Sequence, residues 1–284
     1  MGKRKQKSGM VTGKTSIISM GLLILALFVC AFPFYVMIVG AFKNNTALES
    51  APPDLNPFVH VNLDSFRYVL KETEVILWFK NSLVLAVSVS VITMIVAAMA
   101  GYSFAKFKSR ILSLLFGVVL ATMALPQTML LVPNFLVAKT LHLNNTMIGT
   151  ILTSVAPPFG IFLCRQFMKD IPDELLEAAE LDGCGEFYKF IRIVIPLSLP
   201  AFGALFIFTF LGVWNDFLWQ SIMLNSQSLT TLAIGIQKVT VSSMLARYSY
   251  QFALSFISTI PIFIVFFSCQ KLFIKGISSG AVKG

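Results

Sequence analysis

The sequence predicts an all-α, polytopic membrane protein with six transmembrane helices. Of its 284 residues, 56% are hydrophobic and 12% are charged, and the mean hydropathy is +0.81. A soluble domain usually has about twice that charged fraction. The apolar residues also form runs of the length that a helix needs to cross a bilayer, about 20 residues. Composition and run length together place the chain in a membrane.

Six apolar runs fit this length. Gly, Pro and Ser inside them are tolerable, because neighbouring helices or water can satisfy the freed backbone groups. The first run is much longer than the 7–15 apolar residues typical of a signal peptide core, so we interpret it as an uncleaved span. The expected spans cover residues 16–42, 81–105, 111–132, 147–168, 200–224 and 250–272.

Prolines interrupt two of these runs. Pro126 and Pro133 in the third span should bend or end its helix, and so should Pro157 and Pro158 in the fourth. Broken helices often line a transport path, although proline is common in membrane helices generally.

The distribution of basic residues predicts the orientation. With the amino terminus inside, the four inner segments hold five, three, four and three Lys or Arg residues, which is 15 of the 22 in the chain. The positive-inside rule favours this topology. We therefore expect a basic cytoplasmic tail at residues 1–15, a membrane domain at 16–273 and a cytoplasmic tail at 274–284. Because the basic residues lie between spans, the net charge of +9 does not indicate nucleic-acid binding.

No constellation of catalytic or metal-binding residues is apparent. The only histidines are His60 and His142, and the four cysteines lack the C-x-x-C spacing of metal or redox sites. The chain also lacks a phosphate-binding loop preceded by a strand. We expect a protein that is not an enzyme and carries no cofactor of its own.

The most organised polar segment is the loop at residues 169–199. Asp173 follows a proline and would lie at the positive end of a helix dipole. Gly183 is typical of a residue that ends a helix in a left-handed conformation. A second short helix is expected over 186–194, running to Pro196, which cannot continue it without a kink. The segment predicts a helix–turn–helix on the cytosolic membrane surface.

This loop resembles the EAA loop of ABC-importer permeases, whose pattern is E-A-A-x3-G-x9-I-x-L-P. The one departure is Ile195, where the family usually has Leu. The flanking residues are similar to the carbohydrate-uptake branch of the maltose type. The resemblance implies a coupling helix that sits in a groove of a cytoplasmic ATPase. The residues that it assigns to this contact are Glu177, Ala178, Ala179, Asp182, Gly183, Ile193 and Pro196.

Two further segments resemble the same branch. Residues 101–107, GYSFAKF, match its GY-x-x-A-[KR] pattern at the end of the second expected span. The carboxyl tail from Lys275 is similar to that of the second, shorter maltose-type permease, where it reaches into the ATPase dimer interface. A flexible tail without such a contact is the alternative. The tail residues implied in this contact are Ser279, Gly280, Ala281 and Lys283.

A candidate substrate path lies in the fifth expected span. Asp216 is the one acidic residue inside any expected span, and ionisable groups in a bilayer are by default functional or internally paired. Its surroundings resemble the W-N-[ED]-F motif of carbohydrate permeases, in which aromatic faces could stack on sugar rings. An aromatic belt with a capped carboxylate is the alternative. The candidate residues are Trp214, Asn215, Asp216 and Trp219.

The first outer loop, about residues 43–80, is the longest. Its prolines predict extended chain, and a short interfacial helix is expected over 62–70. The loop would either contact a soluble partner outside or cap the helix bundle.

The resemblance implies a permease subunit of an ATP-driven carbohydrate importer in the bacterial cytoplasmic membrane, surrounded by lipid and working by alternating access. Its implied partners are a second permease, a cytoplasmic ATPase dimer that binds ATP and Mg, and an extracytoplasmic solute-binding protein. The alternatives are an importer for a non-sugar substrate such as glycerol phosphate or a polyol, and an ion-coupled secondary transporter. A secondary transporter would carry several intramembrane charges, and a membrane enzyme would need partners for Asp216.

Overall fold

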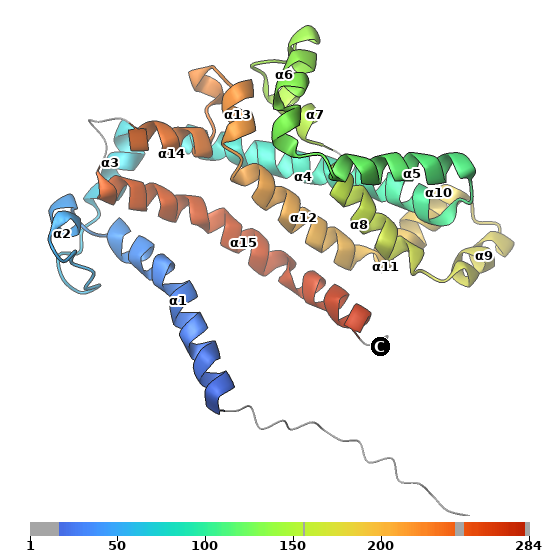
Figure 1. The fold of residues 1–284 in the computed structure, drawn as a ribbon, viewed down its shortest axis with the longest axis horizontal. Helices are drawn as coiled ribbons and strands as arrows, with labels where there is room; N and C mark the ends of the chain where they lie inside the picture. Colours follow the sequence, from blue (N-terminus) through green and yellow to red (C-terminus); the bar gives the residue numbers. More distant parts are fainter. Residues whose placement is uncertain (1–16, 156, 242–246, 282–284) are drawn as a thin grey trace, which may run out of the picture.

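The computed structural model describes residues 17–155, 157–241 and 247–281, and this part of the chain folds into helices without a β-strand (Figure 1). The all-α prediction is confirmed. The basic tail expected at 1–15 and the tail residue Lys283 lie outside the described residues.

Three of the helices are by themselves long and apolar enough to cross a membrane. They are α1 (Ile17–Ala41), α4 (Val75–Lys106) and α15 (Tyr248–Ala281). Three bent helix pairs also pass the same test, so the described residues give six spans when each pair counts as one. Helix α15 continues into the tail expected at 274–284, and Ser279, Gly280 and Ala281 have helical backbone.

The third expected span is divided near Pro126. Helix α5 (Arg110–Met123) ends before it, and the 3-10 turn η1 (Gln127–Leu130) and helix α6 (Leu131–Thr140) follow at 100° to α5. The break predicted at Pro126 is confirmed. Pro133 lies in the first turn of α6, where its missing N–H has no helical partner to lose, so the expected break there is wrong.

The fourth expected span is divided at its paired prolines. Helix α7 (Met147–Ser154) ends before Pro157, and helix α8 (Pro158–Lys169) begins with Pro158 in its first turn. The predicted break is confirmed.

A single helix over 200–224 was the wrong expectation for the fifth span. Helix α12 (Leu199–Trp214) ends early, and α13 (Leu218–Met223) begins after a three-residue break. The Asn215 amide donates to the carbonyl of Leu211, and Asp216 Oδ1 accepts from the backbone N–H of Trp219 at 3.0 Å. Short polar side chains that bond nearby backbone groups compete with helix continuation in this way. The 3-10 turn η3 (Gln227–Leu229) and helix α14 (Leu232–Val241) follow.

Helix α4 is the centre of the packing. It contacts α8, α12 and α14, while α15 lies along α12 and meets α1 and α3 (Figure 1). Near the α3 and α14 end, a buried cluster includes Trp78, Phe210 and Leu254. Near the opposite end, a second cluster joins α4 and α8 to the loop that follows α8.

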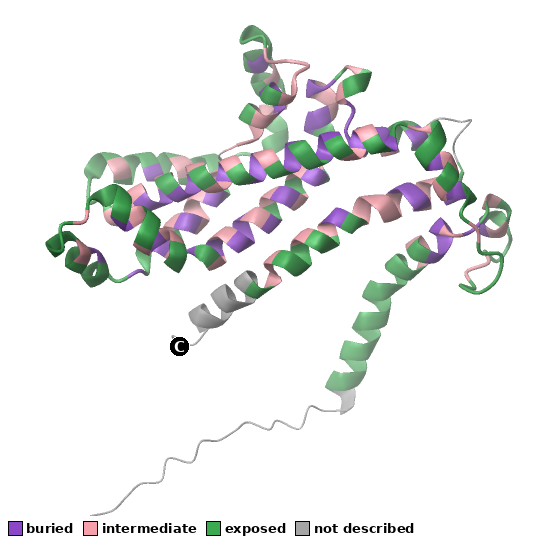
Figure 2. Cartoon of the chain, turned by 180° about the vertical axis from the view of Figure 1, so that it is seen from behind, coloured by how far each residue is buried: buried purple, intermediate pink, exposed green. Residues whose placement is uncertain are grey.

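Helix α1 stands largely away from this bundle. Figure 2 shows it exposed along most of its described length, and only its last turns are buried against α15. Its apolar side chains, such as Leu27 and Phe28, lie free of the rest of the chain. A surface of this kind requires lipid or another apolar partner rather than water.

The loop between α1 and α4 is organised by a buried cation. Lys43 is fully buried, and its ammonium group lies 2.9 Å from Asp54 Oδ2 and also donates to the carbonyl of Val59. His60 Nδ1 lies 3.1 Å from the same carboxylate. The loop holds α2 (Asn45–Glu49) and α3 (Asp64–Glu72). The helix expected at 62–70 is thus confirmed with slightly later bounds.

Replacing Asp54 with Asn should lower the melting temperature in detergent at pH 7, because buried Lys43 loses its anionic partner. Hydrogen bonds from Lys43 and then His60 hold the pKa of Asp54 well below its ordinary value of 3.8. The carboxylate therefore stabilises the fold above pH 3.8, and this contribution is lost as the pH falls further.

Thermal unfolding across pH should show a gap between wild type and D54N that persists from pH 7 to about 5 and narrows in stronger acid. Asp64→Asn, at an exposed position of α3, is the control and should change the melting temperature little. A gap that stayed the same below pH 3.8 would contradict the assignment.

Candidate coupling site and substrate path

The loop after α8 folds as a helix–turn–helix, as predicted. Helix α9 (Asp173–Leu181) is followed by α10 (Glu186–Lys189). Gly183 between them has φ +81°, a left-handed conformation that favours glycine. The N–H groups of Gly183 and Cys184 donate to the carbonyls of Glu180 and Ala179, both at 2.9 Å. This pair of hydrogen bonds is the Schellman motif, which ends a helix.

The second helix runs through Pro196 instead of ending there. A π-helical turn, η2 (Phe190–Val194), precedes α11 (Ile195–Leu197), and the Ile195 N–H donates to the carbonyl of Phe190. A wider turn before a proline accommodates the backbone bond that proline cannot make. The expected kink is present, but the bend of 74° falls at Ser198.

The residues that match the EAA pattern lie mainly on the exposed face of this loop, away from the helix bundle. Leu176 is buried in the cluster that joins α4 and α8, which fixes the opposite face of α9. Ala179 and Ile193 are half-buried, and the other five are exposed: Glu177, Ala178, Asp182, Gly183 and Pro196.

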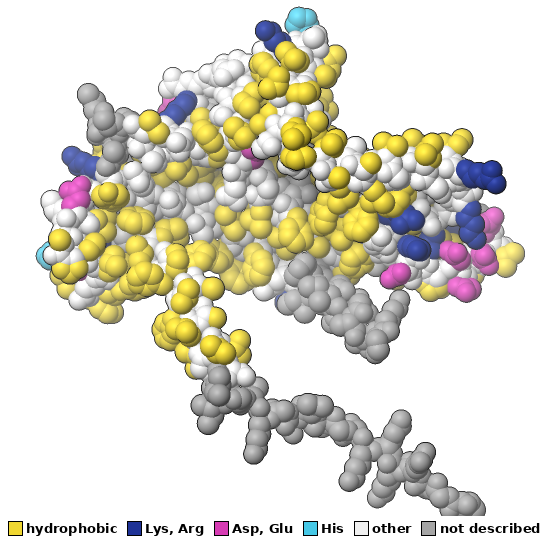
Figure 3. Space-filling view, in the orientation of Figure 1, with side chains coloured by type: hydrophobic (Ala, Val, Ile, Leu, Met, Phe, Trp, Pro, Cys, Tyr) yellow, Lys and Arg dark blue, Asp and Glu magenta, His cyan; other side chains and the backbone are white. Residues whose placement is uncertain are grey.

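Large apolar side chains accompany them. Leu181 is 91% exposed and Phe187 is 76% exposed, and Leu175 and Tyr188 are also exposed. In Figure 3, Lys, Arg, Asp and Glu side chains gather at the same end of the molecule, around α9 and the start of α5. The face is therefore outside the hydrocarbon region, and it is both apolar and charged, which suits a protein partner.

Two side chains of α4 hold this loop in place. Lys106 Nζ lies 2.7 Å from Asp173 Oδ1 and also donates to the carbonyl of Ile171. The Lys106 hydrogen bond and charge lower the pKa of Asp173. One turn earlier, the Tyr102 hydroxyl donates to Glu186 Oε2 at 2.8 Å. The first contact reaches α9 and the second reaches α10.

A buried lysine joins the two loop helices. Lys189 is 3% exposed, and its ammonium group lies 3.0 Å from Glu180 of α9 and 2.5 Å from Glu186 of α10. Charged groups are buried in this way only when they are paired. Through Glu186, the same network reaches Tyr102.

The sequence reasoning did not predict these contacts. It interpreted the segment 101–107 as a close helix approach with an interfacial cation. Gly101 does provide the close approach, because a Cβ added there would lie 2.7 Å from Cys164 Cβ and 2.9 Å from the Arg165 backbone nitrogen. The available signal was the spacing of Tyr102 and Lys106, which lie four residues apart and so on one face of the helix.

The predicted substrate-path residues surround the break between α12 and α13. Trp214 is 2% exposed and its indole N–H donates to the carbonyl of Ser258, whereas Trp219 is 8% exposed and donates to Thr153 Oγ1. Their rings are packed in the core, so neither offers an open face for stacking in this conformation. Asn215 is exposed, and Asp216 is half-buried as the cap of α13. A path role for these residues stays a prediction.

An open cleft of about 550 Å³ lies beside this break. Its lining includes Phe217, Ser221, Asn225, Gln237 and Lys238, with Leu224, Ile234 and Val241. An exposed ring next to amide, hydroxyl and ammonium groups is a surface that can hold a polar, ring-shaped solute.

Two asparagines fix the loop that borders this cleft. Asn145 Oδ1 accepts from the backbone N–H groups of Asn225 and Ser226, both at 3.0 Å. Asn81 of α4 donates to the carbonyls of Ser228 and Thr230, both at 2.9 Å. Neither residue was singled out from the sequence, because each bonds to residues about 80 or 150 positions away.

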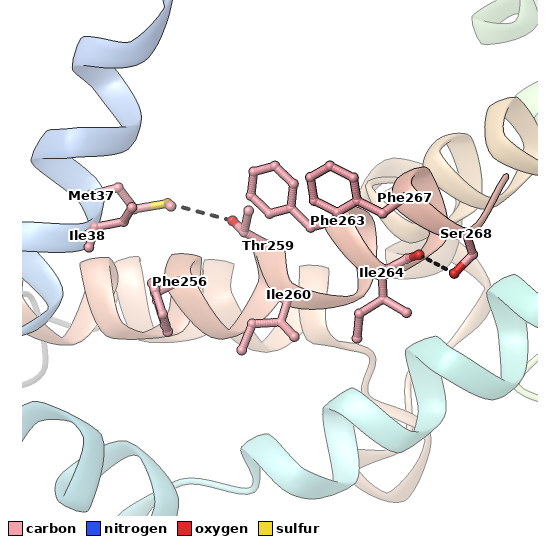
Figure 4. Close-up of a pocket in the computed structure, with 9 residues that line it drawn as sticks. All are labelled: Met37, Ile38, Phe256, Thr259, Ile260, Phe263, Ile264, Phe267 and Ser268. Atoms are coloured by element: carbon pink, nitrogen blue, oxygen red, sulfur yellow. Dashed lines mark hydrogen bonds between the residues drawn. The ribbon is translucent and has the colours of Figure 1, made fainter. Parts of the chain in front are cut away.

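A second hollow, about 520 Å³, lies between α1 and α15 and has a different character (Figure 4). Its lining is dominated by Phe256, Phe263 and Phe267. The Thr259 hydroxyl bonds to the carbonyl of Ser255 and contacts Met37 Sδ, and the Ser268 hydroxyl bonds to that of Ile264. Because apolar and aromatic side chains make up most of this lining, the hollow suits an apolar occupant and not a sugar.

The family model described as binding-protein-dependent transport system inner membrane component matches residues 93–279. The chain belongs to this family. Residues 93–279 include the helix–turn–helix, α12, the candidate cleft and most of α15. Membership makes the chain a membrane transport component and not an enzyme.

The chain is similar over most of its length to three permease proteins. It is 34% identical to the arabinooligosaccharide permease AraQ of Bacillus subtilis (strain 168), covering 89% of this chain and 90% of AraQ. It is 32% identical to the lactose permease LacG of Rhizobium radiobacter, covering 94% of this chain and 96% of LacG. It is 30% identical to the sn-glycerol-3-phosphate permease UgpE of Yersinia pestis bv. Antiqua (strain Antiqua), covering 90% of this chain and 93% of UgpE.

The fold is also that of a solved transporter chain. A crystal structure of a bacterial ABC transporter involved in the import of the acidic polysaccharide alginate matches with a TM-score of 0.82 at 20% identity. The match covers 90% of this chain and 95% of that chain. The overall arrangement of the helices is thus that of this solved chain.

Gly101→Ala should destabilise the protein by about 1–3 kcal/mol, because the added methyl group would overlap the backbone of α8. Thermal unfolding of the purified chain measures this. Gly117→Ala is the matched control, since a Cβ there meets nothing within 4 Å. Equal melting temperatures for both variants would show that α4 and α8 do not approach closely at Gly101.

Proposed function

We propose that this chain is one permease subunit of an ATP-driven carbohydrate importer of the bacterial cytoplasmic membrane. It forms the translocation path together with a second permease. A pair of cytoplasmic ATPases binds ATP and Mg and drives alternating access. An extracytoplasmic solute-binding protein delivers the substrate, in keeping with the family's binding-protein-dependent description.

The exposed face of the helix–turn–helix carries this proposal. Leu175, Leu181, Phe187 and Tyr188 project outside the hydrocarbon region and have no apolar cover in the described part of the chain. Because exposed apolar surface of this kind is unfavourable in water, a protein partner is the natural cover. The match to the EAA pattern supports an ATPase as that partner.

The orientation follows from the same assignment. An ATPase that uses cytosolic ATP requires the loop at residues 169–199 on the cytosolic side, and with six spans both termini are then cytosolic. The distribution of Lys and Arg supports this direction. The tail residues Ser279, Gly280, Ala281 and Lys283 would then be available to the ATPases.

The carbohydrate assignment rests on the relatives and on the cleft. AraQ and LacG are permeases for an oligosaccharide and a disaccharide, and the cleft beside Phe217 combines an aromatic ring with amide and hydroxyl groups. Glycerol phosphate is the second candidate, because UgpE is also a relative and Lys238 lines the cleft. Trp214, Asn215, Asp216 and Trp219 support the path by holding the helix break next to this cleft.

Leu181→Ala should weaken ATPase binding about 10- to 150-fold, because docking would no longer bury a leucine side chain worth about 1.5–3 kcal/mol. Glu177→Lys should weaken it as well, by reversing a charge on the same face. Copurification of the ATPase with the tagged permease complex measures both.

Leu141→Ala, at an exposed position far from the loop, is the matched control and should leave ATPase binding unchanged. Wild-type ATPase recovery with L181A and E177K would refute docking at this face.

Uptake into proteoliposomes with the binding protein separates the two substrate classes. We expect an unlabelled neutral oligosaccharide, and not glycerol phosphate, to compete with a labelled one. We also expect Lys238→Gln to leave neutral sugar uptake within about twofold, since a neutral ring needs no cation. If glycerol phosphate competed and the neutral oligosaccharide did not, and if K238Q abolished uptake of glycerol phosphate, glycerol phosphate would be favoured as the substrate.

A further inference from the structure

Helix α9 is held mainly by side chains. It makes no extensive backbone contact with any other helix in the described part of the chain. A helix of nine residues is also too short to be stable alone in water. The contacts of its side chains therefore decide how a displacement of α9 is passed on.

Those contacts converge on one helix end. The last turns of α4 reach α9 through Lys106 and Asp173, and reach α10 through Tyr102 and Glu186. The Tyr102 ring also lies against Phe190, with centroids 5.2 Å apart. Since Lys189 ties Glu180 to Glu186, the two loop helices form one body attached to α4 at two points.

The opposite end of α4 is tied to the border of the cleft. Asn81 donates to the carbonyls of Ser228 and Thr230, and Ser82 Oγ accepts from the N–H of Leu232 at 2.8 Å. Asn81 and Ser82 are both buried, so these bonds are shielded from water.

Helix α4 is unbroken between these two ends. It contains 32 residues, about 48 Å at 1.5 Å each, and it has no proline. The bent pairs, by contrast, are broken near Pro126, at Pro157 and Pro158, and at Ser198. Among the described helices, α4 is the one that is hydrogen-bonded both to the coupling loop and to the segment from Ser228 to Leu232.

From this geometry we infer that α4 is the rigid connection between the ATPase-facing loop and the outer cleft, with Tyr102, Lys106 and Lys189 as its positioning residues. The inference rests on the proposed function. When the ATPases move the helix–turn–helix, α4 moves with it and shifts the loop from Ser228 to Thr230. These three residues need not contact ATP or substrate, and they act by keeping the loop and α4 together.

The test uses the assembled complex in nanodiscs, with Ser228→Cys as an exposed probe on the tied loop. A maleimide labels this cysteine with and without ATP and vanadate, and mass spectrometry of the peptide that contains residue 228 separates its labelling from that of the four native cysteines. We expect the nucleotide to change the labelling rate. In Y102F/K106M, ATPase still copurifies, because the docking face is intact, and the nucleotide-dependent change falls about fivefold or more.

Tyr35→Phe is the matched control. This variant also removes a hydrogen bond from a tyrosine hydroxyl, here to the carbonyl of Leu55 at 2.6 Å. Tyr35 does not bond α4 to the coupling loop or to the segment from Ser228 to Thr230. We expect the full nucleotide-dependent change in this variant. Lys189→Met is the second test variant. It should reduce the nucleotide-dependent change in labelling while leaving Glu186, the hydrogen-bond partner of Tyr102, in place.

A double-mutant cycle makes the test specific. If Tyr102 acts through Glu186, Y102F/E186M should reduce the change no more than the larger single effect, since Met keeps the side-chain length but cannot accept the Tyr102 hydrogen bond. Purely additive losses would overturn the link through this bond. An unaltered nucleotide response in both Y102F/K106M and K189M would overturn the inference as a whole. A wild-type complex without any ATPase or nucleotide response would instead refute the proposed function.

Discussion

The attachment of the helix–turn–helix at residues 169–199 to the carboxyl-terminal end of α4 is the constraint on which the rest of the structure depends. The loop is short, charged and outside the hydrocarbon, so its helices cannot rely on a core of their own. Leu176 supplies one apolar anchor, and Lys106, Tyr102 and the buried Lys189 supply directional bonds. Gly101 allows α8, which leads into the loop, to lie directly against α4. The exposed apolar face is therefore presented by a rigid support.

Breaks in the third, fourth and fifth expected spans give much of the remaining architecture its shape. Pro126 turns the third span, Pro157 and Pro158 divide the fourth, and the Asn215–Asp216 pair divides the fifth. Each break leaves backbone groups that must be satisfied by side chains or by other segments. Asn145 and Asn81 do this for the loop beside the cleft. An unbroken α4 among broken neighbours provides one element that can move as a unit.

Much of this could be predicted from local sequence. The apolar runs, the turn at Gly183 and the breaks at Pro126 and Pro157 depend on a few neighbouring residues, and the structure contains them. The expected breaks at Pro133 and Pro196 were less accurate, because position within a turn and a π-helical turn decided the outcome. Trp214 and Trp219 looked like sugar platforms, yet they are buried by contacts with Ser258 and Thr153. Contacts between residues so far apart in the chain leave no periodic signal.

Photo-crosslinking in intact membranes can show whether an ATPase covers the face around Leu181, as we propose. A photoreactive amino acid would replace Leu181, with a second sample carrying it at exposed Leu141. We expect a crosslink to an ATP-binding protein from position 181 and none from position 141. Crosslinks to lipid alone from position 181, or an ATPase crosslink from 141 only, would contradict it.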